Sequence, residues 1–121
     1  MDIRASVKGP VTVSPGEIKL IPTGLAVSIP AGFEGQIRPR SGLALKHGIG
    51  MVNTPGTIDS DYRGEIGIIV INWGQKPFII RRGDRIAQMI ISKVYHVDII
   101  DVDDLDKTHR GEGGFGHSGV N

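Results

Sequence analysis

Hydrophobic and polar positions alternate over short stretches along most of the chain, which is the pattern of half-buried β-strands. The alternation is clear between Ile18 and Ile29, where the turn sequence Pro22-Thr23-Gly24 interrupts it. Turns rich in glycine and proline separate such runs at intervals of roughly 8–12 residues. Strands are therefore predicted over residues 3–7, 11–13, 18–20, 25–29, 36–40, 66–72, 77–80, 85–94 and 97–102. This organisation predicts an all-β barrel or jelly-roll-like fold.

One short helix is predicted over residues 41–47, where good helix formers follow one another. Ser41 is expected to cap its start and Gly48 to end it. From residue 103 the chain becomes polar and glycine-rich, without a core-forming pattern. We therefore expect a single domain, with a β-barrel over residues 1–102 and a flexible connector and tail over residues 103–121.

Composition excludes several classes of function. Glycine accounts for 18 of the 121 residues, which fits many tight turns. Fourteen basic and thirteen acidic side chains leave a net charge of +1, which argues against binding nucleic acid or a membrane surface through bulk charge. The absence of cysteine excludes disulfides and thiolate metal sites. With no signal peptide and no apolar run of membrane-spanning length, we expect a soluble cytoplasmic protein.

Candidate chemistry is concentrated between Asn53 and Glu65, which the turn signals Pro55-Gly56 and Arg63-Gly64 and the flanking β-branched residues predict to be a β-hairpin. Asp59, Asp61 and Tyr62 lie between the two turns. A tight hairpin holds its side chains still and exposes backbone groups that could read the polar edge of a small planar ligand. The alternative is a surface hairpin with solvated aspartates.

Two other segments could bind an anion or close over a ligand. Arg40-Ser41-Gly42 stands where a strand meets the helix, which indicates either an anion site or ordinary capping. In the tail, Phe115 could stack on a base and Arg110 could pair with phosphate, unless the tail is a passive end. Gly111-x-Gly113-x-x-Gly116 matches a dinucleotide fingerprint, but no strand leads into it and no helix follows, so we reject that interpretation.

Five segments, in the same order, resemble the motifs of the trimeric dUTP pyrophosphatase (dUTPase) family. They are MDIRA at residues 1–5, RPRSGLA at 38–44, the hairpin at 53–64, RGDRIAQ at 82–88 and the glycine-rich tail at 110–119. Family members usually carry a further strand ahead of the first motif. Here the motif begins at Met1, so either the chain is truncated or another strand covers that edge.

The resemblance implies a distorted jelly-roll-like barrel, also called a β-clip, that forms a homotrimer whose sites combine motifs from all three chains. It implies hydrolysis of dUTP to dUMP and diphosphate with Mg²⁺, which limits uracil incorporation into DNA and supplies dUMP for dTMP synthesis. Asp59 would be the catalytic base that deprotonates the attacking water, and Tyr62 would lie against the deoxyribose and exclude a 2′-hydroxyl.

The remaining roles implied by the resemblance concern binding. The uracil and sugar would be recognised by Asn53, Thr57, Ile58 and the backbone of Gly67. The phosphates would be held by Arg40, Ser41, Gly42 and Gln88. The nucleotide would be covered by Arg110, Phe115 and Ser118. Asp2 would reach Mg²⁺ through water.

Two other functions compete with this one. A dCTP deaminase shares the fold and the nucleotide class, but it needs a catalytic glutamate on the strand after the hairpin, where this chain has Ile69. A non-catalytic nucleotide-binding regulatory module is the second alternative. Asp59, Arg40 and Gln88 are all present, which argues against an inactive site.

Overall fold

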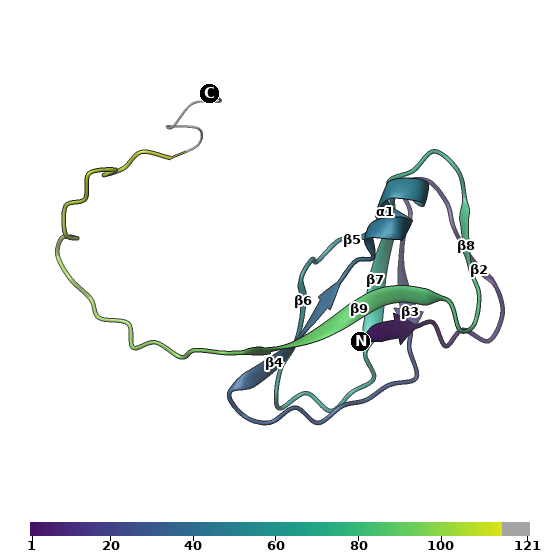
Figure 1. Cartoon of the computed structure of the whole chain (residues 1–121), viewed down its shortest axis with the longest axis horizontal. Helices are drawn as coiled ribbons and strands as arrows, with labels where there is room; N and C mark the ends of the chain where they lie inside the picture. Colours follow the sequence, from purple (N-terminus) through teal and green to yellow (C-terminus); the bar gives the residue numbers. More distant parts are fainter. Residues whose placement is uncertain (115–121) are drawn as a thin grey trace.

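The computed structural model describes residues 1–114, and the expectations for Phe115 and Ser118 therefore lie outside the described residues. Within that range the chain forms short strands arranged as a barrel and one helix (Figure 1). The elements are β1 (Asp2–Arg4), β2 (Val11–Val13), β3 (Ile18–Pro22), β4 (Phe33–Arg38), α1 (Ser41–His47), β5 (Ile49–Met51), β6 (Gly56–Ile58), β7 (Gly67–Asn72), β8 (Phe78–Ile80) and β9 (Arg85–Lys93). The all-β prediction is confirmed.

Three antiparallel sheets enclose the core. The largest has the strand order β1-β9-β4-β6, the second pairs β2 with β8, and the third has the order β3-β7-β5. Strand β9 is the longest and pairs with both β1 and β4, with Gln88 opposite Asp2 on one side and opposite Arg38 on the other. Strand β1 is an edge strand, and no other described strand covers its outer edge.

The core is built from aliphatic side chains at alternating strand positions. In β7, Ile68, Val70 and Asn72 are fully buried, whereas the residues between them face the other side of the sheet. Complete burial of one such aliphatic side chain stabilises the fold by roughly 1.5–3 kcal/mol. The other large aliphatic side chains that are fully buried are Ile3, Val13, Ile21, Ile66 and Ile80.

The helix spans the predicted residues, but its start differs from the prediction. Arg40 occupies the N-cap position, its carbonyl accepts hydrogen bonds from the Leu43 and Ala44 amides, and no side chain caps the helix. The prediction that Ser41 caps the helix was therefore wrong, because Ser41 is already the first helical residue. Gly48 ends the helix as predicted, with a left-handed φ of 67° that glycine adopts without a Cβ clash.

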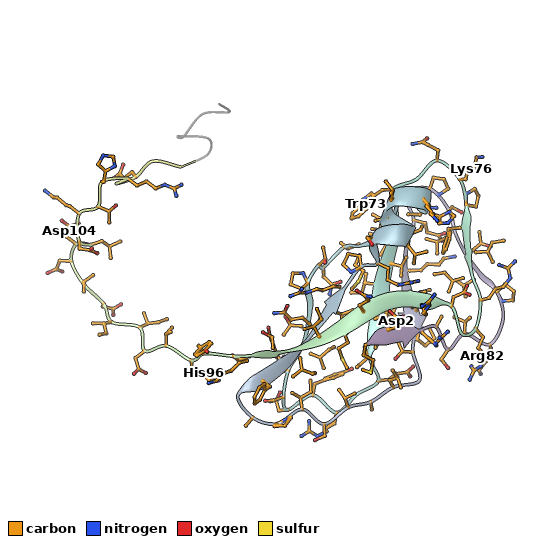
Figure 2. The ribbon with its side chains drawn as sticks, in the orientation of Figure 1. Asp2, Trp73, Lys76, Arg82, His96 and Asp104 are labelled. Atoms are coloured by element: carbon orange, nitrogen blue, oxygen red, sulfur yellow. The ribbon has the colours of Figure 1, made fainter. Side chains whose placement is uncertain are left out.

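Two predicted strands are absent from the described chain. Residues 25–29 are irregular, and the Leu25 carbonyl accepts the Ile66 amide instead of joining a ladder. Residues 97–102 follow the end of β9 in an extended segment, residues 94–114, which we call the C-terminal arm. Figures 1 and 2 show this arm, with His96 and Asp104, running away from the barrel. Ile99 is 90% exposed, so the arm has no partner strand within the described chain.

Candidate functional site

The predicted hairpin is split between two sheets. Strand β5 pairs with β7, and this pairing ends with the Val52 amide donating to the Ile69 carbonyl at 3.4 Å. Strand β6 instead crosses to β4, where Ile58 lies opposite Gly35. The prediction of a simple hairpin was therefore incomplete, because the two arms of the segment between Val52 and Ile66 pair with other strands and not with each other. The space between these arms is a cavity.

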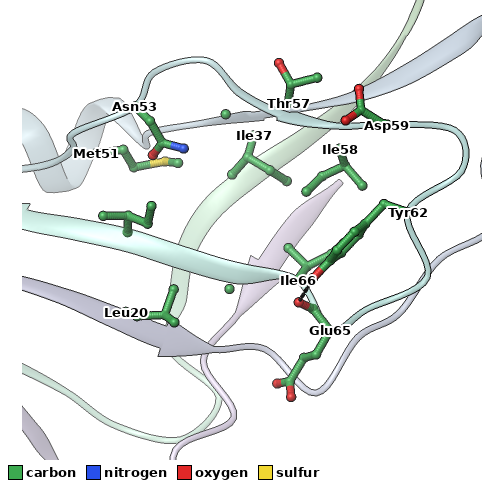
Figure 3. Close-up of a pocket in the computed structure, with 13 residues that line it drawn as sticks. Leu20, Ile37, Met51, Asn53, Thr57, Ile58, Asp59, Tyr62, Glu65 and Ile66 are labelled. Atoms are coloured by element: carbon green, nitrogen blue, oxygen red, sulfur yellow. Dashed lines mark hydrogen bonds between the residues drawn. The ribbon is translucent and has the colours of Figure 1, made fainter.

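This hairpin cavity has a volume of about 330 Å³. Its apolar floor includes Ile37, Met51 and Ile66, which are buried, and its rim carries polar side chains (Figure 3). In that view Asn53 lies at one end and Tyr62 at the other. The structure brings together six of the predicted site residues in the lining: Asn53, Thr57, Ile58, Asp59, Tyr62 and Gly67.

Tyr62 is fixed by three contacts. Its hydroxyl donates to the Glu65 carbonyl at 2.9 Å, and its backbone amide donates to the Asp59 carbonyl at 3.2 Å. The phenol also lies over Gly64, where an added Cβ would be 2.4 Å from the tyrosine oxygen. A side chain at position 64 would therefore displace the exposed ring, so glycine favours the observed position of the phenol.

Asp59 directly follows β6 and lines the rim of the cavity. Its side chain is exposed and lies on the outer side of the strand in Figure 3, whereas the neighbouring Ile58 side chain points toward Tyr62. A carboxylate held at the rim of a nucleoside-sized cavity can accept a proton from a water placed beside a bound ligand.

Three predicted residues, Asp2, Arg40 and Gln88, meet where β1, β9 and the start of α1 converge, together with Arg85, to which the sequence gave no role. The Asp2 carboxylate accepts hydrogen bonds from Gln88 at 3.3 Å and from Arg85 at 3.2 Å, and it lies 4.0 Å from the Arg40 guanidinium. The Gln88 hydrogen bond, and then Arg85 and Arg40, hold the pKa of Asp2 below its ordinary value. We call Asp2, Arg40, Arg85 and Gln88 the phosphate-side cluster.

Arginines dominate the surface beside this cluster. Arg4, Arg40, Arg81 and Arg85 line a cleft of about 430 Å³. Two of them are held by backbone carbonyls, since Arg40 donates to Arg85 at 2.9 Å and Arg4 donates to Gly83 at 2.7 Å. Ser41 and Gly42 are exposed at the adjacent helix start. Positioned guanidinium groups of this kind suit a polyanion such as a phosphate chain.

Within the described residues of one chain, the hairpin cavity and the phosphate-side cluster do not line a common space. The hairpin cavity is lined by no member of the phosphate-side cluster and by neither Ser41 nor Gly42. Arg110 lies in the C-terminal arm, where its side chain donates to the Gly113 carbonyl at 2.6 Å.

Leu20, Glu65 and Ile69 are among the lining residues to which the sequence gave no binding role. Leu20 and Ile69 line the cavity from β3 and β7, and a Cβ added to Gly67 would stand 2.6 Å from the Leu20 side chain. Glu65 also contributes to the lining. Leu20 lies opposite Ile69 in the pairing of β3 with β7, and no local sequence pattern reveals a pairing between residues so far apart. Glu65 was within the recognised stretch, but its sequence neighbours gave it no role.

Residues 1–114 contain no group of three or more histidine, cysteine or acidic side chains that could hold a metal ion by themselves. Asp2 is partly exposed beside groups suited to phosphate, so it fits a metal that is held jointly by a carboxylate and a bound phosphate. Mg²⁺ commonly keeps several waters and is held by one or two carboxylates together with substrate phosphates. The helix of the described chain is not long and apolar enough to cross a membrane.

Known proteins resemble this chain over almost its whole length. The dUTPase family model matches residues 2–119. A deoxyuridine 5′-triphosphate nucleotidohydrolase from Caldanaerobacter subterraneus subsp. tengcongensis is 59% identical over 120 residues, which cover 99% of this chain and 81% of that protein.

Solved structures agree in fold. The Staphylococcus bacteriophage 80alpha dUTPase with dUPNHPP matches with a TM-score of 0.88 at 29% identity, over 98% of this chain and 85% of that one. A point mutant of the dUTPase from phage phi11 of S. aureus, whose structure describes the coordination of a structural Mg(II) ion, matches with a TM-score of 0.77 at 26% identity, over 85% of this chain and 82% of that one. The chain therefore belongs to the dUTPase family.

Proposed function

We infer that the protein hydrolyses dUTP to dUMP and diphosphate, with water attacking the α-phosphorus. The observation that carries this inference is the hairpin cavity, in which Asp59 and a fixed Tyr62 stand at the rim of an apolar-floored space of about 330 Å³. Family membership supplies the substrate, and the related 80alpha dUTPase has been solved with dUPNHPP.

In the proposed mechanism the uracil enters the hairpin cavity, where Asn53, Thr57 and the backbone near Gly67 pair with its polar edge. A wrong base leaves these groups unpaired, which gives selectivity. Tyr62 lies against the sugar and leaves no room for a 2′-hydroxyl. Asp59 orients a water and accepts its proton, a role that typically contributes about 10²–10⁴-fold to the rate.

The phosphate chain is held by Arg40, Ser41, Gly42 and Gln88, and Arg110, Phe115 and Ser118 cover the nucleotide from the tail. Neutralising the phosphate charge makes the phosphorus a better electrophile. Mg²⁺ supplies part of that neutralisation when bound, with Asp2 holding its water shell. We also propose a cytoplasmic location, since such an enzyme acts where deoxynucleotides are made.

We propose that the working form is a homotrimer with shared sites. Two observations support this: the hairpin cavity and the phosphate-side cluster do not line one space in a single chain, and the C-terminal arm exposes apolar side chains. Contiguous exposed apolar surface is typical of an interface. The exposed large hydrophobic residues of the arm are Tyr95, Val97, Ile99, Ile100, Val102 and Leu105.

Deamination is disfavoured by the position of Ile69. This side chain lines the hairpin cavity, at the position where a deaminase of this fold would need a glutamate. An isoleucine cannot transfer protons. Incubation with dUTP and with dCTP, each with Mg²⁺, separates the possibilities: diphosphate from dUTP supports the inferred activity, ammonia from dCTP indicates deamination, and neither product indicates a binding module.

The shared site has a direct test. Light scattering should give the mass of three chains. Asp59→Asn and Arg40→Ala proteins, each nearly inactive, should regain activity when unfolded and refolded together, because some mixed trimers would combine an intact hairpin with an intact phosphate side. A monomer that hydrolyses dUTP, or a mixture without regained activity, would exclude shared sites.

A further inference from the structure

The hairpin cavity is latched to a loop outside every recognised motif. The Glu65 carboxylate oxygen Oε1 accepts the backbone amides of Thr23 and Gly24, at 3.1 and 2.8 Å. Figure 3 shows that this carboxylate points away from the cavity, while the carbonyl of the same residue faces Tyr62. Glu65 therefore contacts the loop with one end and the cavity rim with the other.

Further hydrogen bonds join the same loop to the next residue. The Thr23 hydroxyl donates to the Ile66 carbonyl at 2.6 Å and accepts the Leu25 amide at 3.2 Å. The Ile66 amide in turn donates to the Leu25 carbonyl at 2.8 Å. Thr23 is one of the few buried polar residues of the described chain. The loop is thus a rigid anchor, tied to a fully buried Ile66.

The segment between Tyr62 and Glu65 needs such an anchor. A side chain at Gly64 would displace the phenol from its observed position, and glycine also leaves the backbone freer to change conformation. The Tyr62 hydroxyl bonds to the Glu65 carbonyl at 2.9 Å, so any displacement of Glu65 moves the ring. The carboxylate bond to Thr23 and Gly24 opposes that displacement.

We propose that Glu65 is a positioning residue for sugar selectivity: its carboxylate, bound to the Thr23 and Gly24 amides, holds Tyr62 where it excludes a 2′-hydroxyl. This rests on the proposed hydrolysis of dUTP and on the proposed role of Tyr62. Glu65 touches neither the reacting phosphorus nor the attacking water. Its removal should therefore change the choice between dUTP and UTP more than the rate with dUTP.

The test measures kcat and KM for dUTP and for UTP, together with the thermal midpoint, in the parent and in Glu65→Ala. We expect the ratio of the two kcat/KM values to fall about tenfold, as loss of a hydrogen bond to a charged group allows. The kcat for dUTP should fall by a smaller factor than the selectivity ratio. Glu65→Gln keeps an oxygen acceptor and should restore most of the selectivity.

Glu17 provides a matched control. Its carboxylate also accepts a loop amide, that of Ser14 at 2.8 Å, but it does not line the hairpin cavity. Glu17→Ala should lower the thermal midpoint without changing the dUTP/UTP ratio. If Glu65→Ala does not fold, Glu65→Asp takes its place, because its shorter side chain keeps the charge and shortens the reach.

The outcomes are distinct. An unchanged ratio in the Glu65 variant, or an equal change in Glu17→Ala, overturns the positioning role while parental dUTP hydrolysis stands. A parent that releases no diphosphate from dUTP overturns the proposed function, and the positioning role with it.

Discussion

Replacing Asn72 by alanine should destabilise the fold strongly, although the residue lies outside the hairpin cavity. Asn72 is fully buried at the end of β7, and its amide nitrogen donates to the Val13 and Lys76 carbonyls, both at 2.8 Å. Its side-chain oxygen accepts the Gly74 amide at 2.8 Å. One side chain thus satisfies three backbone groups from two segments, strand β2 and the loop between β7 and β8.

The size of the loss in stability follows from the backbone groups that Asn72→Ala would leave without a hydrogen-bond partner. The Val13 carbonyl bond is buried, and the other two are partly buried and can recruit water. Roughly 1–3 kcal/mol per orphaned buried group, with less for the two that reach water, gives a loss of about 3–4 kcal/mol. At roughly 4 °C per kcal/mol for a domain of this size, the thermal midpoint should fall by about 12–16 °C.

Denaturant and thermal unfolding at one fixed protein concentration would measure this, with Asn53→Ala as the control. Asn53 is exposed, so the same chemical change there should cost less than about 0.5 kcal/mol. Asn72→Asp should be at least as damaging as alanine, because its carboxylate would face two carbonyl oxygens. A loss below about 1 kcal/mol in Asn72→Ala, or a stable Asn72→Asp protein, would refute the reasoning.

Three further outcomes are expected. Asp59→Asn should lower kcat by about 10²–10⁴-fold and leave dUTP binding nearly intact in a direct binding assay, and activity within a few-fold of the parent would remove Asp59 from the base role. Deleting residues 110–121 should lower kcat strongly with little change in thermal midpoint, because residues 110–112 are exposed and no described strand pairs with them; an unchanged kcat would mean a passive tail. The hydrogen bond from the Ser14 amide, followed by the contact with Lys19, holds the pKa of Glu17 below its ordinary value. The Glu17 carboxylate therefore stabilises the fold above its ordinary pKa, and this stabilisation is lost as the pH falls through the lowered pKa. Glu17→Gln should therefore be less stable than the parent at neutral pH, and thermal midpoints that do not converge in acid would contradict this.

Local sequence signals predict a helix or strand correctly where they agree with the tertiary contacts. Helix α1 is such a case, since good helix formers and Gly48 act within a few residues, although the residue that caps its start was predicted wrongly. Strand β7 is another, because its alternation matches the buried face of the barrel. The residues between Asn53 and Tyr62 that line the hairpin cavity were also predictable as a group, since they lie close together in one recognised segment.

Long-range pairing explains what was missed. The β-branched residues among positions 97–102 are typical of a strand, but no described strand lies beside this segment, and a strand cannot form without a partner. The crossing of β6 to β4 depends on partners about twenty residues away. The latch between Glu65 and Thr23 spans 42 positions, so neither residue's neighbours indicate it.

The floor of the hairpin cavity has a consequence for how the protein can change over evolutionary time. Ile37, Met51 and Ile66 belong both to the cavity lining and to the hydrophobic core. Mutational drift at these positions is therefore restricted twice, once by foldability and once by the shape of the base that we propose binds there. A lineage that repacks this core to adapt to a new temperature would alter its substrate preference as a by-product, and relaxed selectivity could arise without any change at the catalytic rim.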